Sequence, residues 1–102
     1  NTLAEQVING SINPADHAHA FLVMGLVLYQ QQDYMSCIAS LKRVIMLFPE
    51  YKDVRLKAVE YSIRAQIYNG ALTEAEMQIA KYSNELDQGV VVELSELLEG
   101  RL

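Results

Sequence analysis

Two histidines beside an acid are the first residues in the chain that could do chemistry. His17 and His19 follow Asp16, and imidazole and carboxylate groups are common ligands of metal ions. On a helix, residues i and i+2 point about 200° apart, so the two imidazoles cannot share one ion. Asp16 and His19 are the only pair with suitable geometry. We therefore expect a solvated helix start or a groove wall here, and no metal site.

The single cysteine is the next candidate for chemistry. Cys37 cannot form an internal disulfide, and no Lys, Arg or His is adjacent to it in the sequence. A reactive thiolate needs a cationic and accessible setting, so we expect Cys37 in the core. The sequence has no glycine-rich phosphate loop, zinc-ligand spacing or nucleophile elbow. These features predict a protein that is not an enzyme and needs no cofactor.

Charge and hydropathy narrow the class of partner. The 102 residues include eight Lys and Arg against thirteen Asp and Glu, which argues against binding to nucleic acid through phosphate contacts. The basic residues cluster in 42–64, between acidic ends. No apolar run approaches the roughly 20 residues of a membrane-spanning helix. We expect a single cytoplasmic domain without membrane insertion.

Hydrophobic residues recur at helical spacing in six segments. The predicted helices cover residues 2–8, 14–31, 33–48, 50–69, 73–86 and 88–99, with Asn13, Asp33 and Thr73 as N-caps. Glu76, three residues after Thr73, predicts a capping box there. A β-branched run, Val90–Val92, leaves a strand as an alternative in the last segment.

Two of these segments carry two apolar stripes each. The helix over 14–31 has hydrophobic residues on two sides, so it must be covered on both. In the helix over 50–69, two stripes of hydrophobic residues repeat at helical spacing. The first stripe comprises Val54, Ala58, Tyr61, Ala65 and Tyr68, and the second comprises Leu56, Val59, Ile63 and Ile67.

Short connections make successive helices antiparallel neighbours. The predicted fold is therefore all-α, an antiparallel helix-hairpin array of about six helices in one domain. An N-terminal helix (1–12) precedes two hairpins (13–51 and 52–86), and a C-terminal helix (87–102) caps the second. Leu94, Leu97 and Leu98 match a leucine pattern that docks in helix grooves, but capping is the favoured interpretation because arrays need a closed end.

The two hairpins share a pattern at an offset of 38 residues, from Cys37 to Ala75. In the first, Gly25 suits a close approach of two helices, Tyr29 and Tyr34 bracket the turn, and Pro49 ends the unit. Residues 18–51 thus resemble a tetratricopeptide repeat, a helical repeat of about 34 residues. The second hairpin matches at Ala65, Gly70, Leu72 and Ala75, although it lacks the final proline and is about four residues longer.

The resemblance implies a partner polypeptide in a concave groove lined by the first helix of each hairpin. A partner with apolar side chains and at least one acidic group would suit the residues carried over to this groove, and a merely solvated helix face is the alternative. The groove candidates are His19, Leu22, Leu26, Tyr29, Gln30, Lys57, Glu60, Arg64 and Tyr68.

Three functions follow from this interpretation. The first is an adaptor or scaffold module that binds a protein or peptide. The second is a small chaperone, similar to those of secretion systems, that shields an aggregation-prone client. A metal-dependent enzyme is the third and least favoured. The sequence leaves open whether the chain forms a homo-oligomer or belongs to a longer repeat array.

Overall fold

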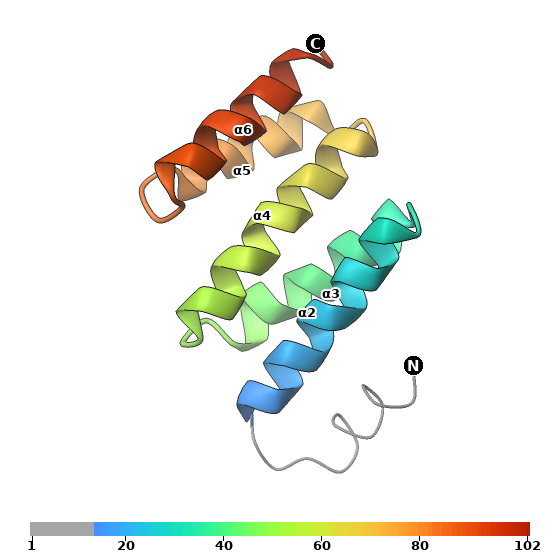
Figure 1. The fold of residues 1–102 in the computed structure, drawn as a ribbon, viewed down its shortest axis with the longest axis vertical. Helices are drawn as coiled ribbons and strands as arrows, with labels where there is room; N and C mark the ends of the chain where they lie inside the picture. The colour runs from blue at the N-terminus through green and yellow to red at the C-terminus, as the bar shows by residue number, and fades with distance from the viewer. Residues whose placement is uncertain (1–13) are drawn as a thin grey trace.

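The computed structural model describes residues 14–102, which form five α-helices (Figure 1). The all-α prediction is confirmed for this part of the chain, and Val90–Val92 are helical, so the strand alternative is wrong. The helix expected over residues 2–8, and its neighbouring cap Asn13, lie outside the described residues. The helices are α2 (Pro14–Gln30), α3 (Tyr34–Leu47), α4 (Lys52–Tyr68), α5 (Leu72–Tyr82) and α6 (Gln88–Glu99).

Local chemistry explains where α3 and α5 begin. The Asp33 carboxylate caps α3 by accepting a hydrogen bond from the Ser36 N–H at 3.4 Å, as predicted. The predicted capping box at Thr73 is wrong, because α5 begins at Leu72 and its N-cap is Ala71. Gly70 has a φ of 84°, which turns the chain sharply, and the Ala71 N–H then donates to the Gln66 carbonyl. Because of this tight turn, α5 begins closer to the N-terminus than predicted, and Thr73 lies within its first helical turn.

The helices pack in two layers. Figure 1 shows α2, α4 and α6 side by side, with α3 and α5 behind them. Within the described residues, α2 contacts α4 and α4 contacts α6, whereas α3 and α5 do not contact each other. The described chain is therefore more closely packed in its first layer than in its second.

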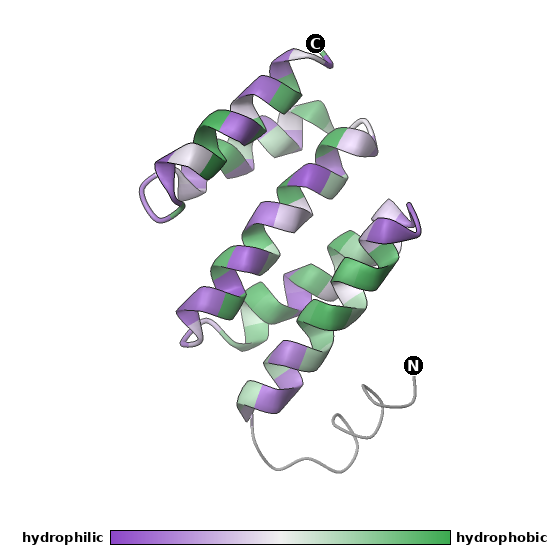
Figure 2. Cartoon of the chain, viewed as in Figure 1, coloured by the Kyte–Doolittle hydropathy of each residue, from purple (hydrophilic) through white to green (hydrophobic). Residues whose placement is uncertain are grey.

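Two hydrophobic clusters fill the space between the layers, and α4 contributes to both. Ala58 and Ala65 of α4 pack with the α2–α3 hairpin, and Val59, Ile63 and Ile67 pack with α5 and α6. The two stripes predicted on this helix are thus confirmed as its two buried sides. Figure 2 shows the hydrophobic residues of α2 gathered in its second half, beside this packing.

Two predicted packing roles are also confirmed. A Cβ placed on Gly25 would lie 2.3 Å from Leu41 Cδ2, so α2 and α3 approach too closely there for a side chain. Cys37 is fully buried in the same cluster.

Leu94 and Leu98 are buried against α4 and α5, so they are not available to dock in another protein's groove. No helix in residues 14–102 is long and apolar enough to cross a membrane.

Candidate functional site

Four tyrosines from three helices form a packed group, which we call the tyrosine cluster. It comprises Tyr29 in α2, Tyr34 in α3, and Tyr61 and Tyr68 in α4. The Tyr29 ring is central, with centroids 5.1 Å from Tyr61, 5.9 Å from Tyr34 and 6.2 Å from Tyr68, all edge to face. Tyr34 stacks on Tyr68 at 5.6 Å. These geometries are the favoured ones for aromatic pairs, and all four side chains are half-buried, so part of the cluster faces solvent.

The ends and spacing of the helices place these rings. After α2, Gln32 adopts a left-handed φ of 64° and the Asp33 N–H donates to the Leu28 carbonyl, so a three-residue turn separates α2 from α3. Tyr29 and Tyr34 therefore flank the turn, as predicted. The other two rings are seven residues apart on α4, which puts them on one side of that helix.

Three cations surround the cluster. Lys57 Nζ lies 5.6 Å from the centroid of the Tyr61 ring, and the Arg64 guanidinium lies 5.6 Å from the same ring. The Arg101 guanidinium, just beyond α6, lies 4.8 Å from the Tyr68 centroid. Cations at these distances are attracted to the electron-rich ring faces.

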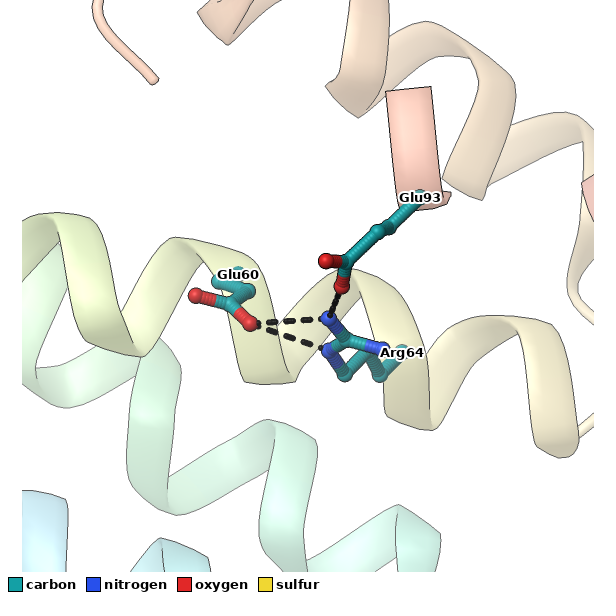
Figure 3. A network of polar contacts seen from close by, with 3 residues as sticks. All are labelled: Glu60, Arg64 and Glu93. Atoms are coloured by element: carbon teal, nitrogen blue, oxygen red, sulfur yellow. Dashed lines mark hydrogen bonds and ion pairs between the residues drawn. The ribbon is translucent and has the colours of Figure 1, made fainter. Parts of the chain in front are cut away.

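The charge of Arg64 is already neutralised, as Figure 3 shows. Its Nη2 donates at 2.9 Å to Glu60 on the same helix and at 2.9 Å to Glu93 on α6. Burial lowers the pKa of Arg64, but the hydrogen bonds to Glu93 and Glu60 outweigh it and raise the pKa above its ordinary value. Arg64 therefore ties α4 to α6. In contrast, Lys57 and Arg101 make no ion pair within residues 14–102.

The central phenol keeps its proton across the physiological range. Burial, followed by the neighbouring Tyr68, raises the pKa of Tyr29 to about 12, and Arg64 opposes the shift. A neutral Tyr29 can donate one hydrogen bond and accept others. The cluster thus combines aromatic surface, a phenol donor and two cations without a carboxylate partner.

The structure brings together five of the groove candidates and separates the others. Tyr29, Lys57, Glu60, Arg64 and Tyr68 all contribute to the cluster or to the ion pairs beside it. The remaining four take no part in these ring contacts and ion pairs. Leu22 is only 7% exposed, so it offers no open surface, whereas Leu26 is half-buried on the same core and His19 and Gln30 are exposed. His19 lies ten residues before Tyr29, which is about 15 Å along α2.

Four members of the site were not among the groove candidates. Tyr34 was predicted only to flank the turn after the helix over residues 14–31. Tyr61 was assigned only to an apolar stripe, although its spacing from Lys57 and Arg64 places it between them on α4. Glu93 and Arg101 come from the C-terminal part of the chain. No local pattern marks them, because their roles depend on how α6 packs against α4.

Neither an ion-binding site nor a known relative defines the chemistry further. Within residues 14–102, no group of three His, Cys, Asp or Glu side chains could hold a metal ion. No protein-family model, curated protein or solved structure matches the chain.

Proposed function

We propose that this chain is a non-enzymatic module, similar to a tetratricopeptide repeat domain, that binds a partner polypeptide at the tyrosine cluster. The observation that carries the proposal is the pairing of half-buried tyrosine rings with Lys57 and Arg101, whose charges no described carboxylate neutralises. Tyrosine supplies a large contact area with a polar end and is enriched at protein interfaces.

The packing of the layers supports this choice of surface. Because α4 contacts both α2 and α6 while α3 and α5 do not contact each other, the first layer is the more closely spaced side of the array. In stacked hairpins the more closely spaced side is the inner side of the curve. The residues of the tyrosine cluster come mainly from this layer.

The cations define the chemistry of the partner. Lys57 and Arg101 lie over Tyr61 and Tyr68, which are seven residues apart, or about 10 Å along α4. An extended polypeptide covers that distance in about three residues. In an extended chain every second side chain faces the same surface. The proposed partner segment therefore has two acidic residues two or four positions apart, with an apolar or aromatic side chain on the same face that packs on the tyrosine rings.

Charge reversal tests the proposal. Lys57→Glu together with Arg101→Glu should abolish capture of the partner from a native lysate, measured by quantitative mass spectrometry. Arg64 is left intact because it holds α4 and α6 together. Both substituted side chains are exposed, so the melting temperature should stay within a few degrees of that of the parent chain.

Lys81→Glu is the matched control. Lys81 also lies over a tyrosine ring, that of Tyr82, but on α5 and outside the cluster. We expect it to capture the same proteins as the parent chain. If the double variant and the control capture the same proteins in the same amounts, the tyrosine cluster is not the binding surface.

A chaperone is the second candidate, and exposed apolar residues on the second layer favour it. Met35, Met46 and Leu47 of α3 are 69%, 76% and 60% exposed, and Met77 of α5 is 63% exposed. Flexible methionines adapt to varied apolar clients. A chaperone should copurify with one unstable client in fixed ratio, whereas an adaptor should exchange its partner within minutes in a competition experiment.

A further inference from the structure

A furrow of about 340 Å³ lies between α3 and α5, and no member of the tyrosine cluster lines it. Met35, Ile38 and Lys42 of α3 form one wall and Glu74 of α5 contributes to the other. The end of α4 lies between these two helices, which do not contact each other, and its residues Gln66 and Asn69 form the floor of the furrow. Its volume is at the lower end of the range for binding pockets.

The floor holds a buried acceptor without a partner. Gln66, on α4, is 2% exposed and lines the furrow, and its Oε1 has no hydrogen-bond partner among the described residues. Its neighbours along the same helix, Ala65 and Ile67, are buried apolar residues. A buried acceptor that makes no hydrogen bond destabilises the fold. An apolar side chain of similar size would avoid this penalty, so folding alone does not explain the glutamine.

A donor beside the furrow has only a weak partner. Asn69 Nδ2 donates to the thioether sulfur of Met35 at 3.2 Å. Sulfur of this kind is a weak acceptor, and Met35 is exposed and flexible, so a carbonyl oxygen could replace it readily. Asn69 thus offers a donor along the furrow, and Gln66 offers an acceptor once its buried amide rotates toward the furrow.

This pair matches the two polar groups of a main chain. A peptide unit has one N–H that donates and one C=O that accepts. In a helix these groups are already bonded to each other, whereas in an extended segment they are free to bind. Lys42 and Glu74 add opposite charges on the two walls, which suits a segment with an acidic and a basic side chain.

We propose that the furrow between α3 and α5 binds an extended polypeptide segment, which donates a main-chain N–H to Gln66 and accepts at a C=O from Asn69. The segment carries an acidic side chain for Lys42 and a basic one for Glu74. This site is separate from the tyrosine cluster, and it stands even if the proposed function there fails.

N-methylacetamide, a single peptide unit, is the first probe. Added to the ¹⁵N-labelled full chain, it should shift the side-chain amide signals of Gln66 and Asn69 in a saturable way. The signals of Gln78 and Asn84, which do not line the furrow, should stay in place and serve as controls. Unchanged signals from Gln66 and Asn69 at saturating probe would overturn the proposal.

Gln66→Leu is the decisive variant. Selection from a displayed library of random twelve-residue peptides should yield binders to the parent chain, and Gln66→Leu should weaken the best of them about fivefold or more. The double variant Lys42→Glu with Glu74→Lys should enrich peptides with the reversed order of charges. If no peptide is selected, or if the selected peptides bind Gln66→Leu equally well, the furrow is not a polypeptide site.

Stability separates this role from a structural one. Because Gln66→Leu removes an unbonded acceptor, the melting temperature should stay level or rise. A large fall in melting temperature would show that the amide is needed inside the fold, and this too would overturn the proposal.

Discussion

The two sides of α4 are packed in different ways. Toward α2 and α3, the contacts involve small residues: Cys37, Ala58 and Ala65 are all fully buried, and Gly25 lies directly against Leu41. Toward α5 and α6, the space is filled by large aliphatic side chains. These are Val59, Ile63, Ile67, Ile79, Leu86, Leu94 and Leu98.

This difference explains where the tyrosine cluster lies. On α4 the small residues Ala58 and Ala65 alternate with Tyr61 and Tyr68 along one stripe. The small residues let the helices approach closely, so the large rings beside them are placed at the edge of the interface, where they stay half-buried. The stripe toward α5 and α6 has no such alternation, and the aromatic ring in its core, that of Tyr82, is only 7% exposed.

The largest expected effects come from truncating one large side chain on each side. Leu41→Ala on the small-residue side and Ile63→Ala on the aliphatic side should each lower the free energy of unfolding by about 2–5 kcal/mol. Both side chains are at most 1% exposed. Urea denaturation measures the change. A variant with unchanged stability would show that its side of α4 is not packed as described.

The next effect tests the close approach itself. Gly25→Ala should destabilise the chain by about 1–3 kcal/mol, because the new Cβ forces the Leu41 side chain to move. The gain in helix propensity, up to about 1 kcal/mol, offsets part of this. In the double variant Gly25→Ala with Leu41→Ala, the clash is absent, so the two effects should sum to less than their separate values. Simple additivity in the double-mutant cycle would contradict the contact.

Titration of the buried thiol gives a third test of the small-residue side. Burial, and then the nearby Asp33, raise the pKa of the Cys37 thiol from its ordinary value to about 11. The folded chain therefore favours the neutral thiol, so the stability it contributes is complete below pH 9 and is lost as the pH rises toward about 11. Melting temperatures should fall more steeply over this range in the parent chain than in Cys37→Ala. Equal slopes would show that the pKa of Cys37 is not raised by burial in the folded chain.

Periodicity sufficed to predict the five helices of residues 14–102, although α5 ends at Tyr82 and not at Leu86 as predicted. The stripes predicted the two sides of α4. Gly25 and Cys37 were also predictable, because a glycine and a cysteine within apolar helical patterns have few other roles. The start of α5 was not, since it depends on the turn at Gly70 and on a hydrogen bond from Ala71 to Gln66. Composition alone could not show that Arg64 is neutralised.

The candidate site was predictable only where its residues share a helix. Lys57, Arg64 and Tyr68 follow helical spacing on α4, and the repeat pattern added Tyr29. Glu93 and Arg101 reach the site through the packing of α6 against α4, which no spacing along the chain encodes. The unbonded Oε1 of Gln66 is likewise a property of the packed structure, because a sequence does not show which amides lack a partner.

The smallest expected effect concerns the ion pair between Arg64 on α4 and Glu93 on α6. Glu93→Gln should lower the free energy of unfolding by about 0.2–1 kcal/mol, since Glu93 is two-thirds exposed and solvent screens its contact with Arg64. The loss should shrink as salt is added, whereas Glu96→Gln, which removes a carboxylate with no ion pair in residues 14–102, should have no measurable effect.

Glu93→Gln also leaves Arg64 with one carboxylate instead of two, so it should strengthen capture of an acidic partner at the tyrosine cluster. Weaker capture would mean that Glu93 itself contacts the partner, and the binding surface would then extend onto α6.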